Sequence, residues 1–212
     1  MSTIAVIGGT GYAGSSIVKE ASARGHRVIS LSRSLPAEPV DGVRYVQGSA
    51  ADAAEIVTAA DVVVGALSPR AGTEGTLVAT YTKLAGLAAA AGARLIVVGG
   101  FSSLRPAPGA PRFAEGDVPP EFAAEAREGD SVLTALSAGA PENLDWLFVS
   151  PAAAFGAYTP QGEPRGTYRT STDVALFDAE GNSAIEGPDF ALAIVDEIEK
   201  PTRHRSQIHF AN

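Results

Sequence analysis

The chain has 212 residues, of which 45% are hydrophobic and 19% are charged, and its formal net charge is −8. This composition allows a sizeable buried core and argues against global disorder. The acidic balance argues against nucleic acid or an anionic membrane as a partner, because both require a basic face. The absence of cysteine excludes disulfides, thiolate metal sites and cysteine nucleophiles. The three histidines, His26, His204 and His209, are too scattered to indicate a metal site, so we expect no bound metal.

The N-terminus enters an apolar run, Thr3 to Ile7, within three residues and has no basic segment before it. We therefore expect no signal peptide. No stretch approaches the ~18 uninterrupted apolar residues of a membrane span. We expect a soluble, cytoplasmic protein in which residues 1–212 form a single domain, at the upper end of single-domain size.

Short apolar runs alternate with segments of helical spacing along most of the chain. The runs are apolar throughout, which is typical of a parallel sheet covered on both faces. Crossover rules then favour a doubly wound, Rossmann-type α/β fold with a mainly parallel sheet. Strands are predicted at 3–7, 27–31, 43–46, 61–65, 94–98, 144–149 and 206–210, and helices at 11–23, 52–59, 73–91, 121–138 and 188–199, with Asp52 as an N-cap.

The C-terminal third of the chain has a different character. Residues 99–120 are rich in glycine and proline, and residues 151–167 form a second irregular segment. Residues 174–185 suggest a hairpin, with its turn at 178–181. We expect these segments to form a small lid on the substrate side of the sheet, because long loops in compact domains are usually functional.

A glycine cluster, GGTGYAG at 8–14, follows the first strand and opens the first helix. It matches both G-x-G-x-x-G and G-x-x-G-x-x-G, in the strand-to-helix context that confirms such a motif. Glycines allow a ligand to approach the main chain, and the helix N-terminus behind them suits a pyrophosphate. We predict that a dinucleotide binds here, on Gly8, Gly9, Thr10, Gly11, Tyr12, Ala13 and Gly14.

The second strand ends in Ser32, Arg33 and Ser34, about twenty residues beyond Gly11. An NAD site usually places Asp or Glu at this point to hold the ribose 2′-hydroxyl. A cation flanked by hydroxyls suits a 2′-phosphate instead. The sequence therefore favours NADPH over NADH, with a solvated surface arginine as the alternative.

The carboxyl ends of the later strands should complete the cofactor site, because ligands of open α/β sheets bind beyond these ends. Side chains at Gly48 and Ser49 are placed to cover the adenine. The segment after the fourth strand should follow the ribose and pyrophosphate, and small residues after the fifth and sixth strands should approach the nicotinamide. These two groups are Ala66, Leu67 and Ser68, and Gly99, Gly100, Pro151 and Ala152.

Ser102 and Ser103 follow the fifth strand and are the candidate catalytic residues. Either hydroxyl can hydrogen-bond a substrate carbonyl and polarise it for hydride attack. The alternative is a serine that satisfies loop backbone. The candidate substrate pocket comprises Phe101, Phe155, Arg70 and Tyr168, with a surface role as the alternative for Arg70 and Tyr168.

The Tyr-x-x-x-Lys pair of ordinary carbonyl reductases is missing. The predicted helix 121–138, where it belongs, has neither residue type, and Tyr81 and Lys83 have the wrong spacing in an earlier helix. Protonation of an alkoxide would then lack its donor. Hydride transfer to a flavin or a quinone needs no strong protein acid and remains open.

With these motifs in view, the chain resembles the atypical short-chain dehydrogenase/reductases, in their NAD(P)H-binding, NmrA-like branch. The matching pieces are GGTGYAG at 8–14, SR at 32–33, VVGGFSSL at 97–104, LDWLFVSPAAAF at 144–155 and FDAEGNSAI at 177–185. The resemblance implies a Rossmann fold and a nucleotide bound by the glycines and Arg33. Two positions depart from the branch: Gly48-Ser49 stands where relatives usually have Gly-Asp, and Phe101-Ser102 where they often have Ala-Gly.

That branch includes flavin and biliverdin-type reductases, quinone reductases and NADP(H) sensors without turnover. We therefore expect an NADPH-dependent oxidoreductase that transfers hydride to a small-molecule acceptor: a flavin, a quinone or another conjugated compound. The alternatives are a non-catalytic NADP(H)-binding redox sensor or partner-binding protein, and an isomerase or biosynthetic tailoring enzyme with bound NADP. The oligomeric state stays open.

Overall fold

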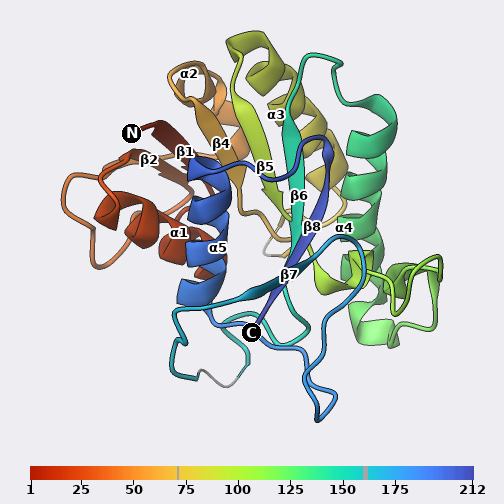
Figure 1. Ribbon diagram of the computed structural model, residues 1–212. Coiled ribbons are helices and arrows are strands. Elements are labelled where there is room, and N and C mark those ends of the chain that lie inside the picture. Colours follow the sequence, from red (N-terminus) through yellow and green to blue (C-terminus); the bar gives the residue numbers. More distant parts are fainter. Residues whose placement is uncertain (71, 160–161) are drawn as a thin grey trace.

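The computed structural model describes residues 1–70, 72–159 and 162–212. Its strands form one sheet in the order β3-β2-β1-β4-β5-β6-β8-β7 (Figure 1), in which β7 is antiparallel to β8 and the other neighbours are parallel. The doubly wound, Rossmann-type α/β prediction is confirmed. The strands are β1 (Thr3–Ile7), β2 (Arg27–Ser32), β3 (Arg44–Gln47), β4 (Val62–Gly65), β5 (Arg94–Val98), β6 (Trp146–Ser150), β7 (Arg169–Ser171) and β8 (Ser206–Ala211).

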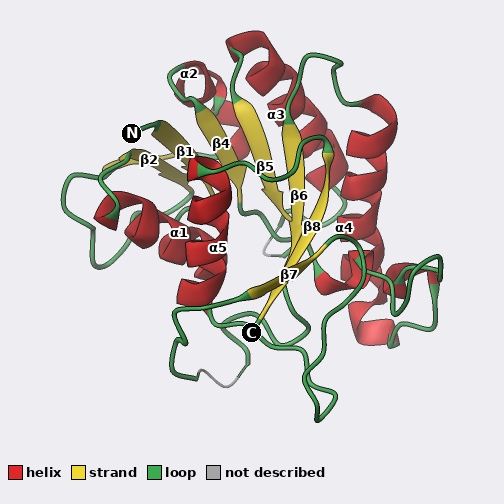
Figure 2. Ribbon diagram, viewed as in Figure 1, coloured by secondary structure: helices red, strands yellow, loops and turns green. Residues whose placement is uncertain are grey.

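Helices cover both faces of the sheet (Figure 2). On one face α1 (Tyr12–Ala23) and α5 (Gly187–Glu199) pack over an apolar cluster that includes Ile4, Val6 and Phe190. On the other face α2 (Ala54–Thr58), α3 (Leu77–Ala91) and α4 (Pro120–Gly139) cover a second cluster. Because alternate strand residues enter opposite clusters, both faces are apolar, as the uninterrupted strands predict. Single 3-10 turns lie at Ala50–Asp52, Phe101–Ser103 and Phe113–Glu115.

The strand order reverses between β1 and β4, which lie side by side at the centre of the sheet. From β1 the chain moves outward through β2 and β3, and it then returns to β4 and continues in the opposite direction. Ile7, at the end of β1, pairs with Gly65, at the end of β4. Connections diverge from this point and leave a crevice beyond the carboxyl ends of the strands, where such sheets bind ligands.

The predicted hairpin at 174–185 is wrong, although its turn is present. Asp178 accepts a hydrogen bond from the Asn182 amide through its side chain (2.7 Å) and donates from its own amide to the Asn182 carbonyl (2.8 Å). The flanks pair elsewhere, through isolated bridges of Val174 with Arg105 and of Ala184 with Ala154. The two flanks separate because the loops after β5 and β6 offer each of them a different backbone partner.

Two helix starts also differ from the prediction, and a hydrogen-bonding carboxylate explains each. The helix expected from Thr73 begins at Leu77, where Glu128 of α4 accepts hydrogen bonds from the amides of Gly75 (2.8 Å) and Leu77 (2.9 Å). Asp52 is not an N-cap, because α2 begins at Ala54, with Ala53 before it. Asp52 instead ends the preceding 3-10 turn, where Ser49 is the N-cap and the Asp52 carboxylate closes a capping box by accepting from the Ser49 amide at 2.9 Å.

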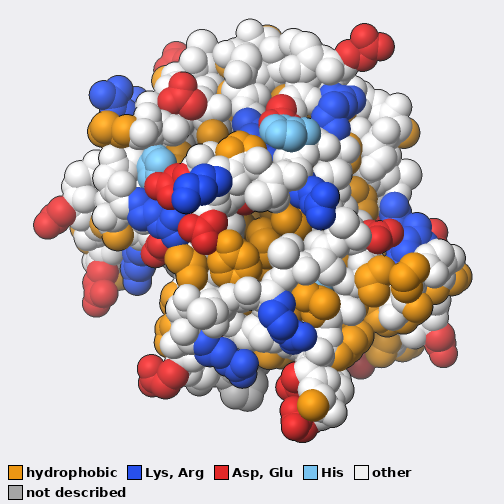
Figure 3. All heavy atoms as spheres, in the orientation of Figure 1, with side chains coloured by type: hydrophobic (Ala, Val, Ile, Leu, Met, Phe, Trp, Pro, Cys, Tyr) orange, Lys and Arg blue, Asp and Glu red, His pale blue; other side chains and the backbone are white. Residues whose placement is uncertain are grey.

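Acidic and basic side chains are intermingled over the face that carries α1 and α5 (Figure 3). At its centre Arg24 of α1 contacts Glu20 (2.8 Å), Asp196 (2.7 Å) and Glu199 (2.9 Å), which ties α1 to α5. The described residues contain no helix with the length and hydropathy that crossing a bilayer requires.

Candidate functional site

The glycine loop after β1 packs so closely that two of its glycines have no room for a side chain. Gly8 has φ +90°, and a Cβ there would lie 2.4 Å from the Ala66 carbonyl oxygen. A Cβ on Gly14 would lie 2.2 Å from the Gly8 carbonyl oxygen. The loop therefore presents main chain to the crevice, wedged between the end of β4 and the first turn of α1.

Helix α1 meets this crevice with its positive end. Its N-cap is Gly11, its first turn has no acidic residue, and no side-chain cap occurs within the described residues. The partial charge of the helix N-terminus is therefore not neutralised by a carboxylate, which is the condition for binding an anionic group.

Ser32, at the end of β2, supports the glycine loop through a hydrogen bond. Its Oγ accepts a hydrogen bond from the Thr10 amide (3.1 Å) and donates to the Leu31 carbonyl (2.8 Å), and the residue is buried. Its hydroxyl thus fixes the glycine loop. Arg33 and Ser34, which follow it, are exposed, and the Arg33 carbonyl accepts from the Gln47 amide group at 3.1 Å.

A cleft of about 260 Å³ opens between the glycine loop, the end of β2 and the N-terminal end of α3. It gathers most of the residues predicted for the adenosine and phosphate half of a dinucleotide: Gly8, Thr10, Gly11, Ser32, Arg33, Ser34, Gly48, Ser49, Ala66, Leu67 and Ser68. Arg70, predicted for the substrate pocket, also lines it.

The sequence interpretation missed part of this lining. Ala50, Thr73, Thr76 and Thr80 also face the cleft. The three threonines are spaced by three and four residues, which in the helix predicted from Thr73 would place them on one side. A row of hydroxyls at the start of a helix is also typical of a solvated surface, so this spacing alone does not identify the cleft.

The residues predicted to adjoin the nicotinamide lie outside this cleft, at the ends of the neighbouring strands β5 and β6. Gly99 packs closely, since a Cβ there would lie 2.0 Å from the Phe148 ring. Pro151 and Ala152 are buried just beyond β6, and Gly100 precedes the 3-10 turn that begins at Phe101.

The two candidate catalytic serines differ in access. Ser103 is 1% exposed, its carbonyl accepts from Gln207 Nε2 at 3.1 Å, and its Oγ has no hydrogen-bond partner among the described residues. Ser102 is partly exposed. Ser102 is therefore the hydroxyl that a substrate can reach without rearrangement of the turn.

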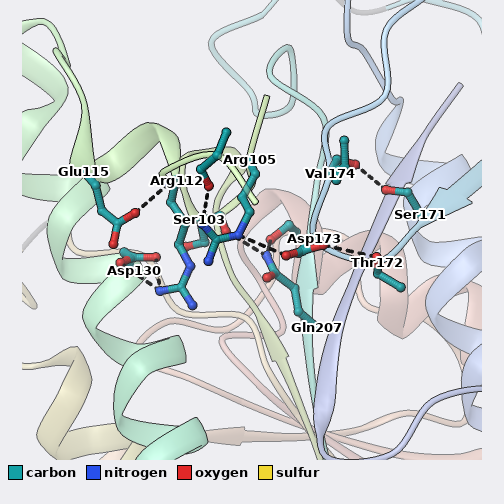
Figure 4. A network of polar contacts seen from close by, with 12 residues as sticks. Ser103, Arg105, Arg112, Glu115, Asp130, Ser171, Thr172, Asp173, Val174 and Gln207 are labelled. Carbon is teal, nitrogen blue, oxygen red and sulfur yellow. Dashed lines mark hydrogen bonds and ion pairs between the residues drawn. The ribbon is translucent and has the colours of Figure 1, made fainter. Parts of the chain in front are cut away.

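Ion pairs anchor the glycine- and proline-rich segment that follows these serines (Figure 4). Arg105 contacts Asp173 at 3.1 Å, and Arg112 contacts Asp130 of α4 at 3.2 Å. These contacts fix the segment to α4 on one side and to the residues that follow β7 on the other.

The aromatic candidates separate into two places. Phe101 stacks on Phe113, with ring centroids 4.9 Å apart, on the α4 side of the sheet. Phe155 packs between Tyr12 (5.1 Å) and Phe190 (4.5 Å) on the α5 side.

The structure does not bring Tyr168 to the cleft. Its hydroxyl donates to Asp196 of α5 at 2.7 Å, and its ring packs on Phe210. Burial, together with the hydrogen bond to Asp196, raises the pKa of Tyr168 to about 12. Tyr168 therefore joins the connection between α1 and α5.

A doubly wound sheet with a glycine loop, an uncapped helix N-terminus and a cleft at its switch point defines a dinucleotide-binding protein. Residues 8–201 match the model of a family described as NAD(P)H-binding, and the chain belongs to this family. The residues at the cleft fit such a cofactor, because the glycine cradle excludes side chains and the helix end behind it is not neutralised.

Relatives of known sequence and structure match the chain over nearly its whole length. The chain is 32% identical over 208 residues to the uncharacterized protein YwnB of Bacillus subtilis, covering 96% of this chain and 95% of the relative. It is similar to a Streptococcus pneumoniae structure provisionally named an NADH-flavin reductase (30% identity, TM-score 0.85, all of both chains). It is also similar to a Burkholderia pseudomallei structure provisionally named an exported protein (34% identity, TM-score 0.84, all of both chains).

Proposed function

We propose that the protein is an NADPH-dependent oxidoreductase that transfers hydride to a flavin, a quinone or another conjugated acceptor. The observation that supports the cofactor most directly is the charge of the cleft. Its described lining includes Arg33 and Arg70 and has no acidic side chain. A carboxylate at the end of β2 would favour the free ribose hydroxyls of NADH, whereas a cation there favours the 2′-phosphate of NADPH.

The bound cofactor supplies the hydride, and the protein supplies position and shape. The glycine loop and α1 would hold the phosphates, and Gly99 and Gly100 would allow the nicotinamide to approach the main chain. Ser102 donates a hydrogen bond to an acceptor carbonyl. Because the chain has no Tyr-x-x-x-Lys pair, the acceptor is one whose reduced form takes its proton from water.

The acceptor class is supported by a relative and by the absence of a Tyr-x-x-x-Lys pair from the chain. The Streptococcus pneumoniae protein carries a flavin reductase name and is 30% identical over its whole length. Its name specifies NADH, so our preference for NADPH rests on Arg33 and the charge of the cleft. A cytoplasmic location and a single small-molecule partner belong to the same proposal.

Loss of nicotinamide absorbance in the presence of a panel of flavins and quinones tests the reaction. We expect NADPH oxidation with at least one conjugated acceptor and none with simple ketones, which need an acid pair. Cofactor binding without turnover on any acceptor would contradict the reductase proposal. The non-catalytic sensor would then be favoured, provided that the cofactor's redox state changes association with a partner.

A further inference from the structure

Arg70 joins three segments at the edge of the cofactor cleft. It lies on the loop after β4 and lines the cleft. Its Nε and Nη2 approach Glu125 of α4 at 3.0 Å and 2.9 Å. Its guanidinium also lies 5.1 Å from the ring centroid of Tyr158, on the loop after β6. One side chain therefore connects the cleft to α4 and to the loop beyond β6.

The contacts that hold Arg70 are exposed and correspondingly weak. The side chains of Arg70 and Glu125 are 48% and 38% exposed, and Tyr158 is 66% exposed. An ion pair in that setting contributes about 0–1 kcal/mol, because water screens it. A phosphate in the cleft would offer the same guanidinium charge-assisted hydrogen bonds in bidentate geometry, which are stronger than those of neutral groups.

The backbone at Arg70 is fixed independently of its guanidinium. The Arg70 amide donates to Thr73 Oγ1 (3.1 Å), and Thr73 Oγ1 donates to the Ser68 carbonyl (2.6 Å). The start of α3 is fixed separately, by Glu128. The side chain of Arg70 can therefore change partner by rotamer changes alone, while the loop and the helix stay in place.

We propose that Arg70 is a latch that exchanges Glu125 for a phosphate oxygen of the dinucleotide, so that Glu125 competes with the cofactor. The proposal rests on the proposed binding of NADPH in this cleft. The direction in which removal of Glu125 changes cofactor affinity distinguishes this proposal from one in which Glu125 only holds Arg70 in place. If Glu125 competes, its removal tightens cofactor binding; if Glu125 only positions Arg70, its removal weakens binding as the loss of Arg70 does.

The test is the dissociation constant of NADPH, measured by nicotinamide fluorescence or calorimetry on the whole chain. We expect Arg70→Ala to weaken binding about tenfold, the loss of one charge-assisted phosphate contact. We expect Glu125→Gln to tighten it about two- to fivefold, the equivalent of an exposed ion pair. In the double variant the gain disappears, because no latch remains to be released.

Glu121→Gln is the matched control, since it removes the same charge from an exposed position of the same helix. This control separates the loss of competition by Glu125 from a general change in the electrostatic potential at the cleft. Two fragments of the cofactor, ADP and adenosine, show whether the competition is at the phosphates. We expect Glu125→Gln to tighten binding of ADP and to leave binding of adenosine unchanged.

The latch would be overturned by weaker NADPH binding in Glu125→Gln, by an equal gain in Glu121→Gln, or by a gain that adenosine shares. An unchanged dissociation constant in Arg70→Ala would overturn it as well, while leaving nucleotide binding intact. Failure of the proposed function has a different signature, because the parent protein then binds no NADPH or oxidises none.

Discussion

At the scale of single residues, the proposed preference for NADPH depends on Arg33. It follows Ser32, whose hydroxyl donates to the Leu31 carbonyl and accepts from the Thr10 amide, and so supports the glycine loop. Arg33 lines the same cleft, beside Ser34. Of the two arginines that line the cleft, Arg33 is therefore the one that we propose contacts the 2′-phosphate.

Arg33→Ala should weaken NADPH binding by about tenfold or more and leave NADH binding nearly unchanged, because only NADPH carries the 2′-phosphate. Titration of both cofactors against the variant measures this. Arg44→Ala is the matched control, since Arg44 is an exposed arginine on β3 that does not line the cleft. Equal losses for the two cofactors would refute the assignment of Arg33.

Gly14 tests the close packing of the glycine loop. Gly14→Ala places a methyl group 2.2 Å from the Gly8 carbonyl oxygen, so the loop or the helix must shift. We expect a loss of about 1–3 kcal/mol in the free energy of unfolding, as for overpacking, and a loss of NADPH affinity. Gly86→Ala, in α3 with nothing within 4 Å of its Cβ, should stabilise the protein by about 0.5–1 kcal/mol. Similar unfolding midpoints for the two variants would contradict this.

At the scale of elements, the sequence predicts what local pattern determines. Strands β1, β2, β4, β5 and β6 are evident because each contains a short apolar run, and the glycine loop is evident because it joins a strand to a helix. The three residues of β7 are polar and too few to produce a pattern, and 174–185 has the turn of a hairpin without its strands. In both cases the pairing partner lies far along the chain, so no local signal exists.

Glu128 shows an element boundary that is set from outside the element. It belongs to α4 and caps the start of α3 by accepting from the amides of Gly75 and Leu77. Glu128→Ala should lower the free energy of unfolding by about 1–2 kcal/mol, as for the loss of an N-cap. Urea unfolding measures it, with Arg127→Ala, an exposed neighbour, as the control. No difference between the two variants would show that water replaces the carboxylate without cost.

At the scale of the whole molecule, the residues that line the cleft could largely be predicted, and the surroundings of the candidate serines could not. The cleft is built from strand ends and a glycine loop, which are fixed by local sequence. The surroundings of Ser103 depend on Gln207, 104 residues later in the chain, and on ion pairs such as Arg105 with Asp173. A serine after a strand is equally compatible with an exposed or a buried hydroxyl until these contacts are known.

The centre of that region contains a buried imidazole, His209 on β8, with no exposed surface. Its Nδ1 lies 2.9 Å from the Ser150 carbonyl, which can only accept, so Nδ1 has the proton. Its Nε2 has no partner among the described residues. Burial lowers the pKa of His209 below its usual value, and the charge of Arg169 on the adjacent strand lowers it further, while the hydrogen bond to Ser150 opposes the shift.

The sign of this pKa shift predicts how stability depends on pH. Below about pH 6.5 the unfolded chain binds a proton at this imidazole that the folded chain does not, so folding becomes less favourable as the pH falls. The free energy of unfolding should decrease with a slope of at most about 1.4 kcal/mol per pH unit from this group. His209→Gln removes the titration, so the stability difference between parent and variant should shrink as the pH falls from 8 towards 5. Urea unfolding across this range measures it, with His204→Gln as the control for loss of an exposed imidazole. A difference that grows towards low pH would mean that the folded protein binds the proton more tightly than the unfolded chain, contrary to the effect of burial.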